Sequence, residues 1–86
     1  MTTRTTPTVV RFNAAFMLPG FDAPRPPGDY RVDLDDESFE GARSAWRRVA
    51  AFVHLPAISA KESTRQMVPI EPATLEAALV EDGRQP

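Results

Sequence analysis

The sequence predicts an α+β domain in which a small antiparallel sheet packs against one C-terminal helix. Several segments alternate apolar and polar residues with a period of two, which is typical of half-buried strands. The segment 72–82 instead repeats its apolar residues at helical spacing, between a proline and a glycine. The length of 86 residues favours one domain. We expect a disordered lead-in at 1–7, the domain at 8–83 and a tail at 84–86.

The first strand is predicted at about 8–18. Alternate positions along it are apolar, but its second face also carries apolar residues, among them Val9 and Met17. A monomer of this size has too few elements to cover both faces, and exposed apolar area of that kind marks an interaction surface. A strand near a terminus also presents an unpaired edge. We therefore expect this strand to contact a partner, which includes a second copy of the chain, through Val9, Arg11 and Met17.

A proline-rich loop and a second strand follow. Residues 19–28 contain four of the nine prolines, and proline removes amide donors, so no strand continues through them. In the segment at about 28–35, Tyr30, Val32 and Leu34 alternate with charged residues. This alternation predicts a strand with one apolar face and one charged face.

Residues 42–54 fit two structures. At helical spacing, Ala42, Trp46 and Val53 share one side with other apolar residues, and the propensity of alanine and arginine favours a helix. At a period of two, the stretch about 46–55 forms a weaker strand pattern. A helix at 42–54 is the alternative that the pattern favours.

The remaining elements are a short strand at about 65–70 and the helix at 72–82, which Gly83 is expected to stop. Pro69 near the end of the strand either places it at the edge of the sheet or terminates it. The apolar residues of all these segments define the predicted core, which comprises Phe12, Phe16, Tyr30, Val32, Leu34, Trp46, Val49, Val53, Ile70, Leu75 and Leu79.

Three runs of the chain resemble small uncharacterised proteins encoded in alphaproteobacterial genomes. These runs are PGDYRVD at 27–33, WRRVA at 46–50 and VPIEPATLEAA at 68–78. The resemblance covers 18–82, and its motifs are structural and imply no function. It implies an extended conformation for residues 47–55. We expect the strand there, because otherwise the chain has too few strands to complete a sheet.

The residue inventory disfavours an enzyme. The chain has one histidine and no cysteine, and its sequence contains no glycine-rich phosphate loop. His54 has no serine or cysteine nucleophile in a recognisable setting. The acidic run at 33–40 begins like a calcium loop, but Ser38 and Ser44 stand where that loop requires glycine and glutamate. We expect no catalytic site, no metal and no cofactor.

The arginines around Trp46 are the strongest functional candidates. Arg43, Arg47 and Arg48 flank this ring, and arginine beside an aromatic residue is enriched at protein interfaces. The same pairing binds nucleic acid. The structural alternative is a core tryptophan whose neighbouring arginines pair with acidic residues on the next strand. We expect a non-catalytic protein–protein interaction module that acts as an adaptor, an inhibitor or a regulator. The alternative is a small nucleic-acid-binding domain that uses the three arginines.

Charge and hydropathy restrict the partners and the compartment. The net charge of −2 gives no basic field that would draw the whole chain to nucleic acid or anionic lipid. The N-terminal segment lacks the apolar run of a signal peptide, and no apolar stretch reaches the roughly 18 residues of a membrane span. We expect a cytoplasmic protein without a membrane partner.

Overall fold

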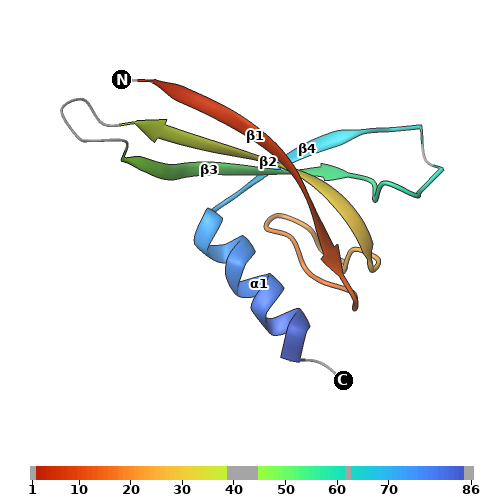
Figure 1. Ribbon diagram of the computed structural model, residues 1–86. Helices are drawn as coiled ribbons and strands as arrows, with labels where there is room; N and C mark the ends of the chain where they lie inside the picture. The colour runs from red at the N-terminus through yellow and green to blue at the C-terminus, as the bar shows by residue number, and fades with distance from the viewer. Residues whose placement is uncertain (1, 39–44, 62, 85–86) are drawn as a thin grey trace.

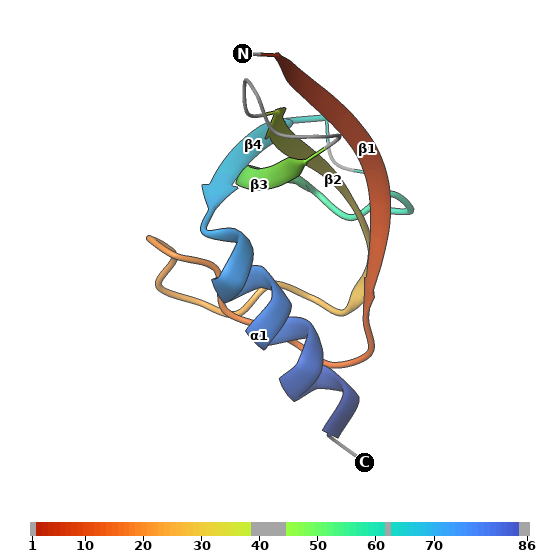
Figure 2. The ribbon, with the colours of Figure 1, turned by 60° about the vertical axis from the view of Figure 1, so that its left-hand side comes forward.

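The computed structural model describes residues 2–38, 45–61 and 63–84 of the chain. Its four strands form one sheet in the order β1-β2-β3-β4, and each neighbouring pair is antiparallel. A single helix lies on one face of this sheet (Figures 1 and 2). The predicted α+β fold is confirmed. The elements are β1 (Thr3–Phe12), β2 (Gly28–Ser38), β3 (Trp46–Leu55), β4 (Gln66–Ile70) and α1 (Pro72–Arg84). In these described ranges, no helix is both long enough and apolar enough to cross a membrane.

β1 begins and ends earlier than the predicted strand 8–18. Residues 3–7, which were predicted as part of the lead-in, pair with β2 from Thr3 opposite Glu37 to Pro7 opposite Asp33. This segment is rich in threonine, a β-branched residue that favours strands. β1 stops at Phe12 because the next two amide groups donate hydrogen bonds to Asp82 of α1 instead of continuing a strand ladder.

The core lies between the sheet and the helix, and it is centred on three aromatic rings. Phe12 and Phe16 are stacked with ring centroids 3.7 Å apart, and Tyr30 meets the edge of both rings. Phe16 belongs to the segment after β1, which is anchored by two backbone hydrogen bonds between Phe16 and Arg25. Phe16 is therefore buried as predicted, although a loop carries it, and Leu18 of the same loop is buried as well.

β3 is a strand, so the helical alternative for 42–54 is wrong for the part of it that the structure describes. Residues 42–44 lie outside the described ranges. The register between β2 and β3 shifts at one point: Asp35 lies opposite Ala50, whereas Asp36 lies opposite Arg48. Val49 is thus an extra residue in β3, a β-bulge. Because of this bulge, the face to which even-numbered side chains point before Val49 is the face to which odd-numbered side chains point after it.

Two core predictions are wrong, and the bulge explains one of them. Continuous alternation from Ala51 and Val53 would place Val49 in the core, but the bulge leaves it 37% exposed. Trp46 is 38% exposed, since it lies near the end of the sheet that extends past the helix (Figure 1). Nine of the eleven predicted residues are buried or partly buried in the core. The prediction missed five further buried residues, namely Leu18, Ala51, Leu55, Ala57 and Val68.

α1 begins at Pro72, as predicted, and extends to Arg84. Gly83 does not stop the helix but lies in its last turn. Leu75 is the buried apolar residue of α1, whereas Ala78 and Leu79 are only partly buried against the core. The helix is therefore anchored by few side chains.

Replacing Leu75 by alanine should lower the free energy of unfolding by about 2–4 kcal/mol, because the change leaves a cavity beneath the helix. The matched control is Val80→Ala on the same helix, where the valine is 49% exposed and the expected change is within about 0.5 kcal/mol. Urea denaturation of both variants and the wild type measures this. Equal midpoints for the Leu75 variant and the wild type would contradict the packing of α1.

Candidate functional site

The structure distributes the predicted partner-binding residues over both faces of the sheet. We call the face that packs against α1 the inner face and the opposite one the outer face. Val9, Arg11 and Arg47 occupy outer-face positions in the register, whereas Arg48 lines a groove beside α1 on the inner face. Met17 lies in the segment after β1, 52% exposed. Arg43 lies outside the described residues. The predicted cluster of three arginines is therefore not one surface.

A different cluster forms on the inner face, and it consists of Arg4, Asp36, Trp46 and Arg48. The Nε of Arg48 donates to one carboxylate oxygen of Asp36 over 3.0 Å, and its Nη2 lies 3.4 Å from the other oxygen. The Nε of Arg4 is 3.6 Å from the same carboxylate. The Arg4 guanidinium also lies 4.0 Å from the centre of the Trp46 ring, in a cation–π contact. We call these four residues the arginine cluster.

Two guanidinium groups thus share one carboxylate. The hydrogen bond from Arg48, with the charges of Arg48 and Arg4, holds the pKa of Asp36 below its ordinary value although burial opposes the shift. The Asp36 side chain is only 6% exposed, while about half of each arginine side chain faces solvent. Asp36 is therefore ionised and neutralises one of the two cations. The arginine cluster retains one positive charge with exposed donors.

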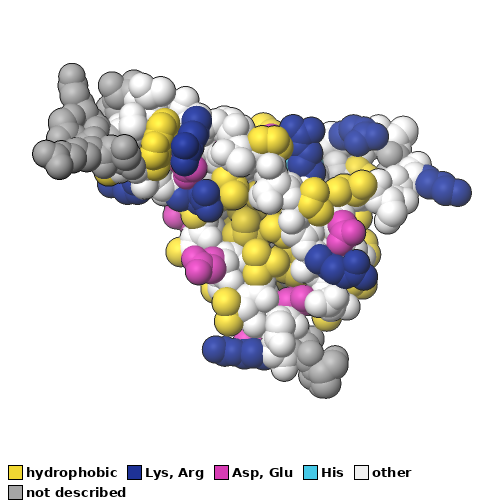
Figure 3. Space-filling view, viewed as in Figure 1, with side chains coloured by type: hydrophobic (Ala, Val, Ile, Leu, Met, Phe, Trp, Pro, Cys, Tyr) yellow, Lys and Arg dark blue, Asp and Glu magenta, His cyan; other side chains and the backbone are white. Residues whose placement is uncertain are grey.

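Beside this cluster, an open groove separates α1 from the inner face. Its volume is about 450 Å³. Figure 3 shows apolar side chains exposed in the middle of this side of the molecule, with basic side chains above them. The groove is lined by Thr8, Val10, Val32, Leu34, Arg48, Pro72, Ala73, Leu75, Glu76 and Leu79.

Asp82 attaches the C-terminal end of α1 to the segment that follows β1. Its carboxylate accepts hydrogen bonds from the backbone amides of Asn13 and Ala14, at 2.9 Å each, and from the Asn13 side chain at 3.2 Å. These donors, the Asn13 amide first, hold the pKa of Asp82 below its ordinary value. These hydrogen bonds fix the C-terminal half of α1, whereas its N-terminal half borders the groove.

On the outer face, none of the described helices or strands covers the sheet. Three large apolar residues protrude around it: Val9 from β1, Met67 from β4 and Ile58 from the segment after β3, each more than half exposed. Val9 and Ile58 line a shallow hollow of about 460 Å³ with Pro7 and Arg31.

The outer face also carries a charged row along β2. His54 Nε2 and a carboxylate oxygen of Asp33 are 2.7 Å apart, and Arg31 Nε lies 3.3 Å from the second oxygen. The hydrogen bond with His54 is the main reason why the pKa of Asp33 is lowered. Nearby, Arg11 lies 3.7 Å from Asp29. This face therefore presents paired charges of both signs between its apolar residues.

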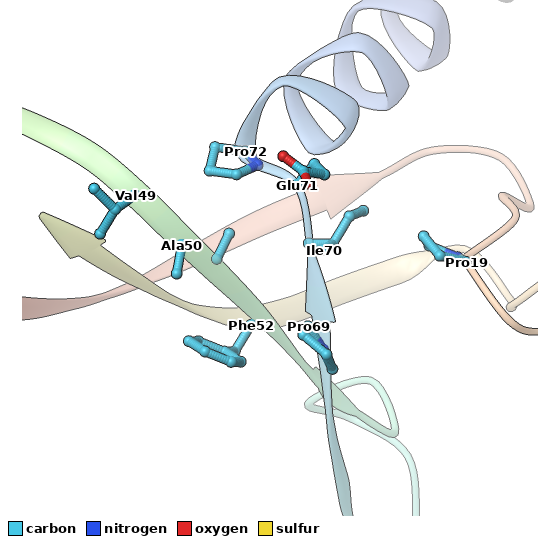
Figure 4. A pocket seen from close by; sticks show the side chains of 9 residues that line it. Pro19, Val49, Ala50, Phe52, Pro69, Ile70, Glu71 and Pro72 are labelled. Atoms are coloured by element: carbon cyan, nitrogen blue, oxygen red, sulfur yellow. The ribbon is translucent and has the colours of Figure 1, made fainter.

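A further hollow of about 310 Å³ lies where β4 ends and β3 continues (Figure 4). Its walls come from residues 49–52, residues 69–72 and Pro19, and Glu71 is the one charged side chain among them. A ligand site normally needs several convergent polar groups to orient its ligand. These walls do not supply them, so we assign no function to this hollow.

The strand edges are poorly suited to pairing with another chain. The Ser38 amide bonds to the Thr2 carbonyl, so the even-numbered residues of β1 direct their backbone groups toward β2. The backbone of Pro7 therefore faces the open edge of β1. Because proline has no amide hydrogen, the middle of this edge lacks a donor at that position. Pro69 lies in β4, and the bulge at Val49 interrupts the free part of β3. Prolines and bulges are the features that prevent edge-to-edge pairing.

No group of three His, Asp or Glu side chains that could hold a metal ion occurs in the part of the chain that the structure describes. The chain matches no known family model, no curated protein and no solved structure.

Replacing Asp82 by asparagine should destabilise the protein at neutral pH, because one oxygen acceptor becomes a donor facing the donors of Asn13 and Ala14. The wild type should lose stability as the pH falls below 3.8, the ordinary pKa of this carboxyl, since its ionised form is stabilised only in the folded chain. The variant should lose less over the same interval. Denaturant midpoints at a series of pH values measure both effects; identical pH profiles would contradict the assigned role of Asp82.

Proposed function

We propose that this protein is a non-catalytic protein–protein interaction module whose outer face docks its partner. The observation that carries the proposal is the exposure of Val9, Ile58 and Met67 on a sheet face that no described helix or strand covers. Antiparallel sheets often leave one face to water, but that face is then polar. Here it exposes large apolar side chains, which is typical of an interaction surface.

A second copy of the chain is the partner that fits this face. A two-fold contact needs a surface that complements itself, and the charged pairs Arg11–Asp29 and Arg31–Asp33 offer both signs beside the apolar residues. The prolines at the open edges of β1 and β4 favour face-to-face packing over the edge pairing expected from sequence. Two outer faces in contact would cover Val9 in both copies.

The alternative of a nucleic-acid-binding domain has weaker support. Arg47 and Arg48 lie on opposite faces of β3, so one bound strand would not contact both. The outer face of β2 carries four acidic residues that would repel phosphates, namely Asp29, Asp33, Asp35 and Glu37. A DNA or RNA complex formed by basic contacts would weaken steeply with salt. We expect no such binding in a salt titration.

Replacing Val9 by glutamate should abolish self-association, because the change places a charge in the apolar centre of the contact. The control is Val80→Glu, at a valine of similar exposure on α1. Sedimentation velocity over a range of concentrations should show a dimer for the wild type and for the control, and a monomer for the Val9 variant.

Circular dichroism and a denaturant midpoint establish that both variants are folded. A wild type that remains monomeric throughout would remove the homodimer, and capture from a lysate of the source cells then tests a different partner. If the Val9 variant also retains every protein that the wild type captures, the outer face is not the docking surface.

A further inference from the structure

We propose that the groove between α1 and the inner face binds a small amphipathic carboxylate, that is, an aliphatic chain with one anionic end. Its chain would lie against the apolar walls of the groove, and its carboxylate would contact Arg48 and Arg4. This site is on the opposite side of the sheet from the proposed docking face, so it is independent of the proposed function.

The first support is that the protein does not fill this space with its own side chains. Val10, Leu34 and Leu79 pack against the core but are only partly buried, and all three line the groove. The volume of about 450 Å³ is within the range of small-molecule sites. The lining is mostly aliphatic, which suits a hydrocarbon chain.

The second support is the charge at one end of the groove. Arg48 itself lines it, and Arg48 and Arg4 share the single carboxylate of Asp36. Arg48 uses Nε and Nη2 for Asp36, so its other terminal nitrogen is not part of that contact. A guanidinium binds a carboxylate well because its donors form a planar fork. The surplus positive charge of the arginine cluster therefore complements an anion.

One opposing charge lies in the groove. Glu76 lines it from the helix side and is exposed to solvent. It would repel a carboxylate. The proposal therefore predicts changes of opposite sign in the affinity for an anion. Removing the charge of Glu76 should strengthen binding of the anion, whereas removing the charge of Arg48 should weaken it.

The experiment compares three probes with the same ten-carbon chain and different head groups: decanoate, decanol and decyltrimethylammonium, each below its micellar or solubility limit. Trp46 is the chain's only tryptophan and belongs to the arginine cluster, so its fluorescence reports on that end of the groove. Titration calorimetry gives the affinities. We expect decanoate to bind at least roughly tenfold more tightly than either other probe, a difference of about 1.4 kcal/mol.

The variants Arg48→Gln and Arg47→Gln form a matched pair, because these adjacent residues of β3 lie on opposite faces and the bulge turns Arg48 to the inner one. The first should weaken decanoate binding by roughly tenfold or more, as expected for the loss of a charged hydrogen bond, and the second should leave it unchanged. Glu76→Gln should tighten it. If Arg48→Gln does not fold, Leu79→Phe gives a separate test, since the larger side chain at a half-buried position should block the chain of the ligand.

The proposal is overturned if decanoate shows no saturable binding. It is also overturned if decanol binds equally well, or if Arg48→Gln and Arg47→Gln have the same effect. Backbone NMR shifts confined to the outer face would likewise assign the probe to another site.

Discussion

The carboxylate of Asp82 joins the two layers of this domain. The hydrogen bonds that it accepts from Asn13 and Ala14 end β1 and hold the C-terminal half of α1. Few apolar side chains anchor this helix, with Leu75 the buried one. The helix is thus attached by Asp82 near its C-terminus and by Leu75 near its N-terminus, and the groove beside β1 and β2 stays incompletely filled. An ionic hydrogen bond and one buried leucine together set the position of the candidate ligand site.

The bulge at Val49 determines which charges reach that site. It places Trp46 and Arg48 on the inner face, where Asp36 and Arg4 meet them, and it directs Arg47 to the outer face. The same two-layer arrangement places none of the described helical residues on the outer face. One small sheet therefore offers two chemically different surfaces: a groove with a positive end, and a face on which exposed apolar side chains lie among paired charges of both signs.

The sequence by itself determined the features that depend on local preferences. Alternation along residues 28–35 predicted β2 and the burial of Tyr30 and Val32, because side chains of a strand point to opposite faces. Pro72 correctly predicted where the helix begins, since proline needs no amide donor there. The exposure of Val9 was likewise predicted, because its neighbours supply the apolar face of the strand. Of the candidate site, the sequence identified Arg48 and Trp46.

Only the tertiary structure decided where β1 ends, which residues form the arginine cluster and which face each arginine of β3 occupies. In these places, contacts between residues distant in the sequence overrode the local pattern. The end of β1 depends on a carboxylate 69 residues away in the chain, so no alternation within 8–18 reveals it. Arg4 joined the cluster only because the threonine-rich start of the chain pairs with β2 and brings it opposite Asp36. A one-residue bulge exchanges the two faces of a strand, and the bulge at Val49 therefore turned Arg48 to the inner face and Arg47 to the outer face, the reverse of what unbroken alternation from Ala51 gives.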